Sequence, residues 1–299
     1  MREDRPSSTA ALIAAATAFL ARDARVADLV PAGAAAWCER CLESLGGPRL
    51  GALRALSHPA LRWAARLAER ATIPGLPLHF MLRKRWIEEA VRAALGAGCA
   101  QVVVVGAGFD TLALRLAGEF RRAAFIEIDH PATQGRKRLA AGAAPGNIHF
   151  IAADLARLPL EDALAGGAYR PGAPSAFVIE GLLMYLTGAE VARVFAALAA
   201  LQRGGGRVVF TVMEPAPDGR SAFHNATPLV TRLLARWSEP FESALARADA
   251  GAFLARHGLR LRDLADSETL RARYLAPSGR EHLGLARGEI ILVAEREAR

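Results

Sequence analysis

The feature that most constrains this chain is an apolar run that leads directly into a glycine turn. Gln101–Val105 holds four consecutive valines, Gly106-Ala107-Gly108 follows, and a helical pattern covers Thr111–Phe120. Glycines at such a turn let a ligand approach the backbone closely. The third glycine of a dinucleotide-binding fingerprint is replaced by Thr111, and no Gly-Lys-Ser/Thr of a P-loop follows. The turn therefore predicts a ligand site and argues against NAD and FAD.

Short β-rich runs alternate with helical patterns from Leu78 onward. This alternation predicts an α/β fold with a mainly parallel sheet covered on both faces. Residues 1–77 lack strand-like alternation, so we expect a helical N-terminal cap over 1–77 and a sheet domain over 78–299. The cap would contain helices over Ser8–Ala21, Ala34–Leu45 and Leu50–Ala71. Seven strands are predicted: Gln101–Val105, Ala123–Ile128, Ile148–Ala152, Ser175–Ile179, Arg207–Met213, Leu259–Leu264 and Glu289–Ala294.

The composition limits the class of protein. The chain has 299 residues, 52% of them hydrophobic, and a net charge of +8. The basic residues are scattered rather than clustered, so a solvated surface is favoured over a nucleic-acid partner. Charged residues interrupt every apolar run before membrane-spanning length, and no secretory signal is visible. Three cysteines fit a reducing compartment, and we expect a cytoplasmic location.

Carboxylates stand at the ends of three successive predicted strands. Glu127 and Asp129 end the second strand on one face, Asp154 follows the third, and Glu180 follows the fourth. The carboxyl ends of parallel strands share the edge of the sheet where ligands bind. Asp129 has the spacing from the glycines at which a carboxylate can accept both hydroxyls of a ribose. S-adenosylmethionine (SAM), with its amino group, ribose and cationic centre, suits such an acidic rim.

Four blocks of the sequence carry a further signal: Arg83–Glu88, Val104–Thr111, Phe125–Pro131 and Ile179–Leu186. These blocks resemble the leucine carboxyl methyltransferase family, and the resemblance covers roughly Leu78 to Glu214. It implies a Rossmann-like seven-stranded sheet with the last strand antiparallel and N-terminal helices over the acceptor pocket. It also implies SAM-dependent methyl transfer, with S-adenosylhomocysteine (SAH) as product; bacterial members include many O-methyltransferases of secondary metabolism.

The resemblance also implies roles for single residues. Arg83 would hold the carboxylate of SAM, and Glu180 would lie near its amino group. Asp129, with Glu127 beside it, would hold the ribose. The turn of Gly106, Ala107 and Gly108, with Asp110, would lie beneath the methionine part, and Asp154 with Leu155 would flank the adenine. The chain departs from the family at Lys84, where Thr or Gly is usual, and at Glu88, where Asp is usual; these departures bear on the acceptor.

The methyl acceptor determines whether a base is needed. A carboxylate acceptor is already ionised at neutral pH, whereas a hydroxyl benefits from a general base. Tyr185 and His224 are the candidates to face the methyl group, and His79 precedes Arg83 and could face the same pocket. A packing or surface position is the competing interpretation of each.

Two other functions stay open from the sequence, and a metal site is not expected. An NAD(P)-dependent oxidoreductase is compatible with the strand, turn and acid arrangement, and the net charge alone prompts a nucleic-acid-binding protein. Cys38 and Cys41 have redox-motif spacing, but zinc needs four ligands and Cys99 is the third and last cysteine. We expect a small-molecule or peptide acceptor, no nucleic acid or membrane partner, and a monomer or homodimer.

Overall fold

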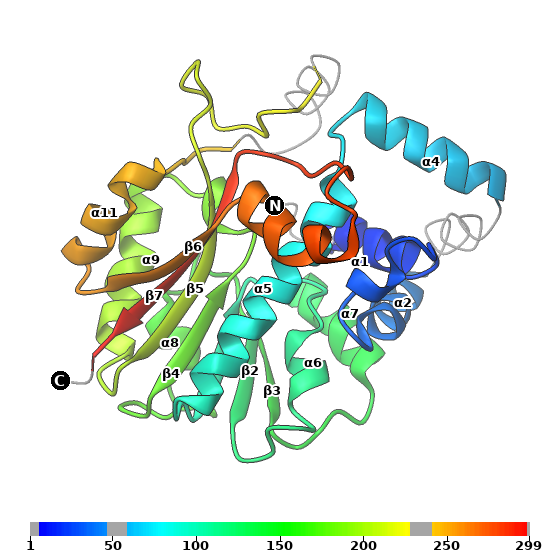
Figure 1. The fold of residues 1–299 in the computed structure, drawn as a ribbon. Coiled ribbons are helices and arrows are strands. Elements are labelled where there is room, and N and C mark those ends of the chain that lie inside the picture. The colour runs from blue at the N-terminus through cyan, green and yellow to red at the C-terminus, as the bar shows by residue number, and fades with distance from the viewer. Residues whose placement is uncertain (1–5, 47–58, 228–240, 298–299) are drawn as a thin grey trace.

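One seven-stranded sheet organises the computed structural model, which describes residues 6–46, 59–227 and 241–297 (Figure 1). The strand order is β3-β2-β1-β4-β5-β7-β6. Strands β1 to β5 run parallel, and β7 is antiparallel to both of its neighbours, β5 and β6. This confirms the predicted fold class. The strands are β1 (Gln101–Val105), β2 (Ala124–Asp129), β3 (Ile148–Ala152), β4 (Ser175–Ile179), β5 (Gly206–Met213), β6 (Arg260–Ala265) and β7 (Glu289–Arg296).

The helices follow the predicted pattern with changed ends. The helix expected over Thr111–Phe120 is shorter and covers Leu112–Leu116. The first part of the helix expected over Leu50–Ala71 lies outside the described residues. The helices are α1 (Ser8–Leu20), α2 (Ala34–Leu45), α4 (Pro59–Ala71), α5 (Leu76–Gly96), α6 (Leu112–Leu116), α7 (Pro131–Ala141), α8 (Leu160–Leu164), α9 (Gly188–Leu201), α11 (Ala250–Arg256) and α12 (Ser267–Leu270).

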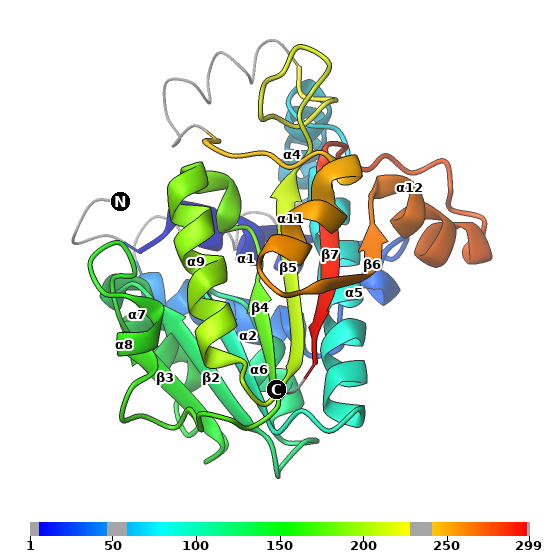
Figure 2. The same ribbon diagram turned by 90° about the vertical axis from the view of Figure 1, so that its left-hand side faces the viewer.

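Alternate residues of the central strands enter two separate cores. In β1, Val102 and Val104 pack with α5 and α6, whereas Val103 and Val105 pack with α8, α9 and α11. Figures 1 and 2 show these two groups of helices on opposite faces of the sheet. All five residues of β1 are buried. Both faces of the central strands are therefore covered, as their continuous apolar runs predict.

The N-terminal helices lie against the sheet domain rather than apart from it. Helix α1 packs on α2 and α5, and α2 packs on α7. Phe19 and Leu20 of α1 belong to the same core as the inner side of α5. Helix α5 begins at Leu76, inside the segment Ile73-Pro-Gly-Leu-Pro77. Gly75, which directly precedes the helix, adopts φ +81°. The division after residue 77, which falls in the first turn of α5, stays a prediction.

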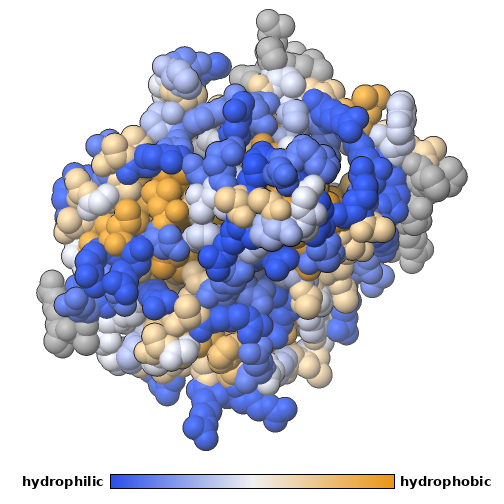
Figure 3. All heavy atoms as spheres, in the orientation of Figure 1, coloured by the Kyte–Doolittle hydropathy of each residue, from blue (hydrophilic) through white to orange (hydrophobic). Residues whose placement is uncertain are grey.

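The surface mixes charges. On the face shown in Figure 3, hydrophilic residues are spread among hydrophobic ones. Several arginines are paired with acids, for example Arg280 with Asp28 and Arg92 with Glu119. Among the helices that the structure describes, none has both the length and the apolar character to cross a membrane.

Candidate active site

The glycine turn is tied to the end of β2. The Gly106 N–H donates to the Ile128 carbonyl at 2.9 Å, and the Gly108 N–H donates to the Asp129 carboxylate at 2.5 Å. The second Asp129 oxygen accepts from the His130 N–H at 2.7 Å. Burial raises the pKa of Asp129, although the Gly108 N–H opposes this effect. The acid predicted to bind a ribose therefore lies at the end of β2, beside the turn.

Both glycines of the turn have conformations that favour glycine, with φ of +68° at Gly106 and +48° at Gly108. A Cβ added to Gly106 would lie 3.1 Å from Leu182, and one added to Gly108 would lie 3.1 Å from Ala10. Helix α1 and the segment after β4 thus close tightly over the turn. Ala107, the third predicted residue of the turn, is buried.

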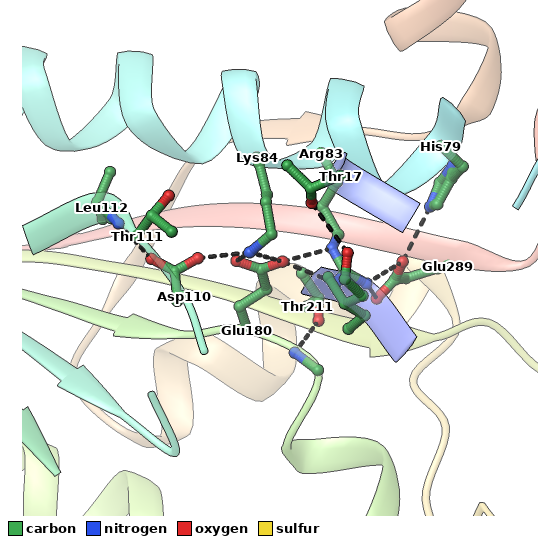
Figure 4. Close-up of polar contacts among 12 residues, drawn as sticks. Thr17, His79, Arg83, Lys84, Asp110, Thr111, Leu112, Glu180, Thr211 and Glu289 are labelled. Atoms are coloured by element: carbon green, nitrogen blue, oxygen red, sulfur yellow. Dashed lines mark hydrogen bonds and ion pairs between the residues drawn. The ribbon is translucent and has the colours of Figure 1, made fainter. Parts of the chain in front are cut away.

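Arg83 lies at the centre of a buried network of charges (Figure 4). Its Nε and Nη2 donate to Glu180 at 2.9 and 2.7 Å, and its Nη1 donates to Glu289 at 2.8 and 2.9 Å. Burial alone lowers the pKa of Arg83, but Glu289 and Glu180 raise it above its ordinary value. The predicted contact of Arg83 with SAM stays a prediction, because Glu180 and Glu289 take these donors here.

Lys84 extends the network toward the glycine turn. Its Nζ forms an ion pair with Asp110 and lies 3.1 Å from Glu180. Asp110 also accepts from the Leu112 N–H at 2.6 Å, at the start of α6. Burial works against the charge of Asp110, but Lys84 lowers the pKa of this carboxyl below its ordinary value. The predicted Asp110 and Glu180 therefore share one cation, and that cation is the residue that departs from the family.

Glu289 belongs to the network although sequence reasoning did not select it. It is the first residue of β7, and it pairs with Met213 at the end of β5. Because β7 is antiparallel, its first residue lies at the edge where the parallel strands end. His79 Nε2 lies 2.9 Å from Glu289 Oε2. Burial favours the neutral carboxyl, but Arg83 and His79 lower the pKa of Glu289 to about 2.

A second buried ion pair joins β2 to α7. Lys137 Nζ lies 2.6 Å from Glu127 Oε2, and both side chains are fully buried. Gln134 Nε2 donates to the Glu127 carbonyl at 2.9 Å. Burial raises the pKa of Glu127 to about 7, although Lys137 lowers it. Glu127 thus lies beneath the surface with Lys137 as its partner, and its predicted contact with a cofactor stays a prediction.

The two residues predicted to flank the adenine lie after β3. Asp154 accepts from the Ala156 N–H at 3.1 Å and lies 3.6 Å from Arg157. Leu155 packs against the core on the α8 and α9 side. Both are partly buried, so they remain near the surface at the edge of the sheet. Their roles stay predictions.

The two predicted catalytic residues lie in different surroundings. The Tyr185 ring stacks edge-on with Phe241, with 5.5 Å between centroids. His224 is exposed, and its Nε2 lies 3.2 Å from the Glu214 carbonyl. The His224 ring lies over Gly288, where an added Cβ would come within 2.6 Å of it. Tyr185 joins a row of aromatic rings, whereas His224 lies beside the start of β7.

The charges of the site fit the amino-acid part of SAM. Arg83 and Lys84 supply two cations, and Glu180 and Asp110 supply carboxylates in the same buried cluster. A zwitterion, which carries a carboxylate and an ammonium group, needs both kinds of partner close together. The Asp129 carboxylate beside the turn adds an acceptor for hydroxyl groups. Among the described residues, no group of His, Cys, Asp or Glu could hold a metal ion.

Comparison with known proteins identifies relatives of the chain. The leucine carboxyl methyltransferase family model matches residues 9–199. A protein of Parafrankia sp. strain EAN1pec is 28% identical over 203 residues, which cover 67% of this chain and 63% of that protein. A protein of Mycobacterium tuberculosis strain H37Rv is 38% identical over 141 residues, covering 46% and 45%. Both have provisional names as SAM-dependent methyltransferases. The chain spans less than two thirds of the length of these relatives.

Solved structures with similar folds share little sequence with the chain. An O-methyltransferase family protein from Burkholderia thailandensis has a TM-score of 0.48 at 16% identity, covering 81% of this chain and 61% of that one. Magnesium protoporphyrin IX methyltransferase from Synechocystis PCC 6803 with bound SAH has a TM-score of 0.46 at 15% identity, covering 74% and 86%. The assignment rests on the family model, which matches more than half of the chain and includes the glycine turn, Arg83 and Glu180. The chain belongs to the leucine carboxyl methyltransferase family, and SAM is its cofactor.

Proposed function

We propose that this chain transfers a methyl group from SAM to an oxygen atom, either a carboxylate or a hydroxyl. The acceptor would be a small metabolite or a peptide C-terminus. The observation that supports this most is the buried alternation of opposite charges through Arg83, Glu180 and Lys84 beside the glycine turn. A ligand with a carboxylate and an ammonium group on one carbon matches that alternation.

The network would bind the cofactor by exchanging partners. Arg83 would release one carboxylate partner as it takes the carboxylate of the cofactor. Glu180, which already binds two cations, would then accept from the ammonium group. Because the zwitterion brings equal and opposite charges, the net charge of this buried cluster would not change. Such an exchange avoids leaving an unpaired buried charge.

The remaining contacts follow the edge of the sheet. Asp129 would hold the ribose hydroxyls, and Asp154 with Leu155 would flank the adenine. Gly106 and Gly108 would bring the backbone close to the methionine part. SAM supplies a methyl group bound to a positively charged sulfur. The residues around it have to align the acceptor oxygen with that methyl group and exclude water.

Other parts of the proposal rest on the sequence. The NAD(P)-dependent oxidoreductase alternative loses its support, because the chain belongs to a SAM-dependent family. A cytoplasmic location, a monomer or homodimer and the absence of a nucleic-acid partner remain part of the proposal. The many arginine–carboxylate pairs on the surface favour a solvated basic surface over a nucleic-acid site.

Transfer to oxygen can be tested by the stability of the methylated product. We would incubate the full chain and methyl-labelled SAM with panels of small carboxylic acids, phenols and amines. The proposal expects label on carboxylic acids or phenols. Mild alkali releases methanol from a methyl ester, whereas a methyl ether keeps its label, so the two oxygen acceptors can be told apart. Label found on the amines and not on either oxygen panel would contradict the proposal.

A further inference from the structure

His79 belongs to the buried network, but the proposed function gives it no role in holding the cofactor. It lies in the first turns of α5 and is completely buried. Its Nε2 lies 2.9 Å from Glu289 Oε2, and Arg83 binds both oxygens of the same carboxylate. An ionised carboxylate only accepts hydrogen bonds, so Nε2 of His79 carries the proton and donates it. This fixes the ring tautomer, and the lone pair of the neutral ring is on Nδ1.

That lone pair has no protein donor within the part of the chain that the structure describes. His79 Nδ1 is buried there without a hydrogen-bond partner. Leaving a buried acceptor unpaired disfavours the folded state. Buried polar atoms of this kind are uncommon, and a hydroxyl group of a ligand would satisfy this one.

The surroundings of His79 suit an aromatic ligand. Its ring meets Phe223 edge-on at 6.4 Å between centroids, Phe223 meets Phe241 at 6.1 Å, and Phe241 meets Tyr185 at 5.5 Å. This row of rings joins the buried network to the predicted Tyr185. Phe223 also lines a cavity of about 290 Å³ formed by the loop after β5. Arg220 and His224 line this cavity as well, and His79 does not, so the ring of the acceptor is placed by the row of rings and its hydroxyl by the unpartnered Nδ1.

We propose that His79, oriented by Glu289, is the general base for a hydroxyl acceptor, and that this acceptor is a phenol or a similar hydroxylated aromatic molecule. The inference rests on the proposed function and deepens it. It selects a hydroxyl over a carboxylate, because an ionised carboxylate has no proton to give to Nδ1. It also assigns the row of Phe223, Phe241 and Tyr185 to the ring of the acceptor.

The step balances without a further reactant. The acceptor O–H proton goes to His79 Nδ1 while the oxygen forms its new bond to the methyl carbon. The bond from that carbon to sulfur breaks, and its electron pair stays on sulfur, which becomes neutral. The imidazolium that results is stabilised by the Glu289 carboxylate at Nε2. It then returns its proton to solvent.

The hydrogen bond to Nδ1 can be observed directly. We would record nitrogen NMR spectra of the full chain with labelled histidine, saturated with SAH, and add 2-naphthol, 2-methoxynaphthalene or 2-naphthoate. The proposal expects a neutral His79 with its proton on Nε2, and a shift of the Nδ1 resonance with 2-naphthol alone. An unchanged Nδ1 resonance with 2-naphthol, or an equal shift with 2-methoxynaphthalene, would overturn it.

The variant His79→Gln tests the role of His79 as a base while keeping its hydrogen bond to Glu289. The glutamine amide can still donate to Glu289, but the Nδ1 acceptor is lost. We expect unchanged SAH affinity and melting temperature, and a loss of methyl transfer to 2-naphthol of about 100- to 10,000-fold. His282→Gln, at an exposed histidine, is the matched control and should retain wild-type transfer. Transfer by His79→Gln within twofold of wild type would overturn the proposal.

The two proposals fail differently in these experiments. If the wild-type chain does not bind SAH, the proposed function itself is wrong. If SAH binds and label is transferred to carboxylates but not to 2-naphthol, the proposed methyl transfer to oxygen is supported. The proposal that His79 is a general base is then wrong.

Discussion

Replacing Arg83 with methionine is expected to destabilise the chain by about 3–5 kcal/mol even when no SAM is present. Arg83 is 2% exposed and pairs with both Glu180 and Glu289. Without it, and counting the residues that the structure describes, Glu289 keeps His79 as its one side-chain partner and Glu180 keeps Lys84. Removing one partner of a buried ion pair leaves a charge without solvation, which is why the effect is large. Urea unfolding of the full chain without ligand measures it.

The conservative variant Arg83→Lys serves as the control. It keeps the positive charge but cannot bind two carboxylates through a planar fork. We therefore expect a smaller loss of stability than for Arg83→Met, and a loss of SAM affinity in both variants. If Arg83→Met unfolds like the wild type without ligand, Arg83 serves the cofactor alone, and the interpretation of the network as a structural unit is wrong.

The second large effect is expected at the buried pair of Glu127 and Lys137, and it depends on pH. The pKa of Glu127 in the folded chain is about 7, above its ordinary value. A raised acid pKa means that the stability it contributes is complete below about pH 4.5 and is lost as pH rises through 7. In the wild type this amounts to about 3 kcal/mol over that window.

Lys137→Met should enlarge this dependence on pH. Without Lys137 the pKa of Glu127 rises further, so at pH 8 Glu127 has to take up a proton when the variant folds, and we expect the variant to lose about 1 kcal/mol more stability at pH 8 than at pH 5. At pH 5 Glu127 is protonated in both the folded wild type and the folded variant, so this pH-dependent part of the loss is absent. Urea unfolding at both pH values gives the comparison.

A double variant isolates the charge. Lys137→Met with Glu127→Gln removes both members of the pair, and neutral replacements of a buried ion pair are often tolerated. The double variant should lose the pH dependence between 4.5 and 8 that the single variant enlarges. An equal loss for Lys137→Met at pH 5 and pH 8 would show that packing, not charge, sets the effect.

Glu289 should change the dependence of stability on pH in the opposite direction, at low pH. Its pKa in the folded chain is about 2, below the ordinary value. The stability it contributes is present above about pH 4.5 and is lost as pH falls toward 2. Glu127 and Glu289 together contribute most to stability near pH 4.5, where the two windows meet.

The local sequence was sufficient to predict most strands of the sheet. The apolar runs at Val102–Val105 and Ser175–Ile179 predicted buried strands because both faces of such strands are covered. The acids at Asp129 and Glu180 could be placed on one edge, since parallel strands end together. The ends of helices were harder to predict from the sequence. Helix α5 begins at Leu76, directly after Gly75, and the positive φ of Gly75 is known only from the folded backbone.

The partners within the site could not be predicted in the same way. Glu289 is far from Arg83 in the sequence, and only the pairing of β7 with β5 brings the two together. The antiparallel last strand was expected, so its first residue could have been placed at this edge. Lys137 lies between Arg136 and Arg138 in the sequence, yet its side chain is fully buried against Glu127. Its position on α7 offered no pattern that separates a buried lysine from an exposed one.

The most direct test of the account is isothermal titration of the full chain with SAM and SAH, alongside Asp129→Asn. The account predicts micromolar binding of both ligands to the wild type. It also predicts about 10- to 100-fold weaker binding to the variant, since a hydrogen bond to a charged group contributes about 1.5–3 kcal/mol. Absence of binding by either ligand, or equal affinity of the variant, would contradict a cofactor site at this edge of the sheet.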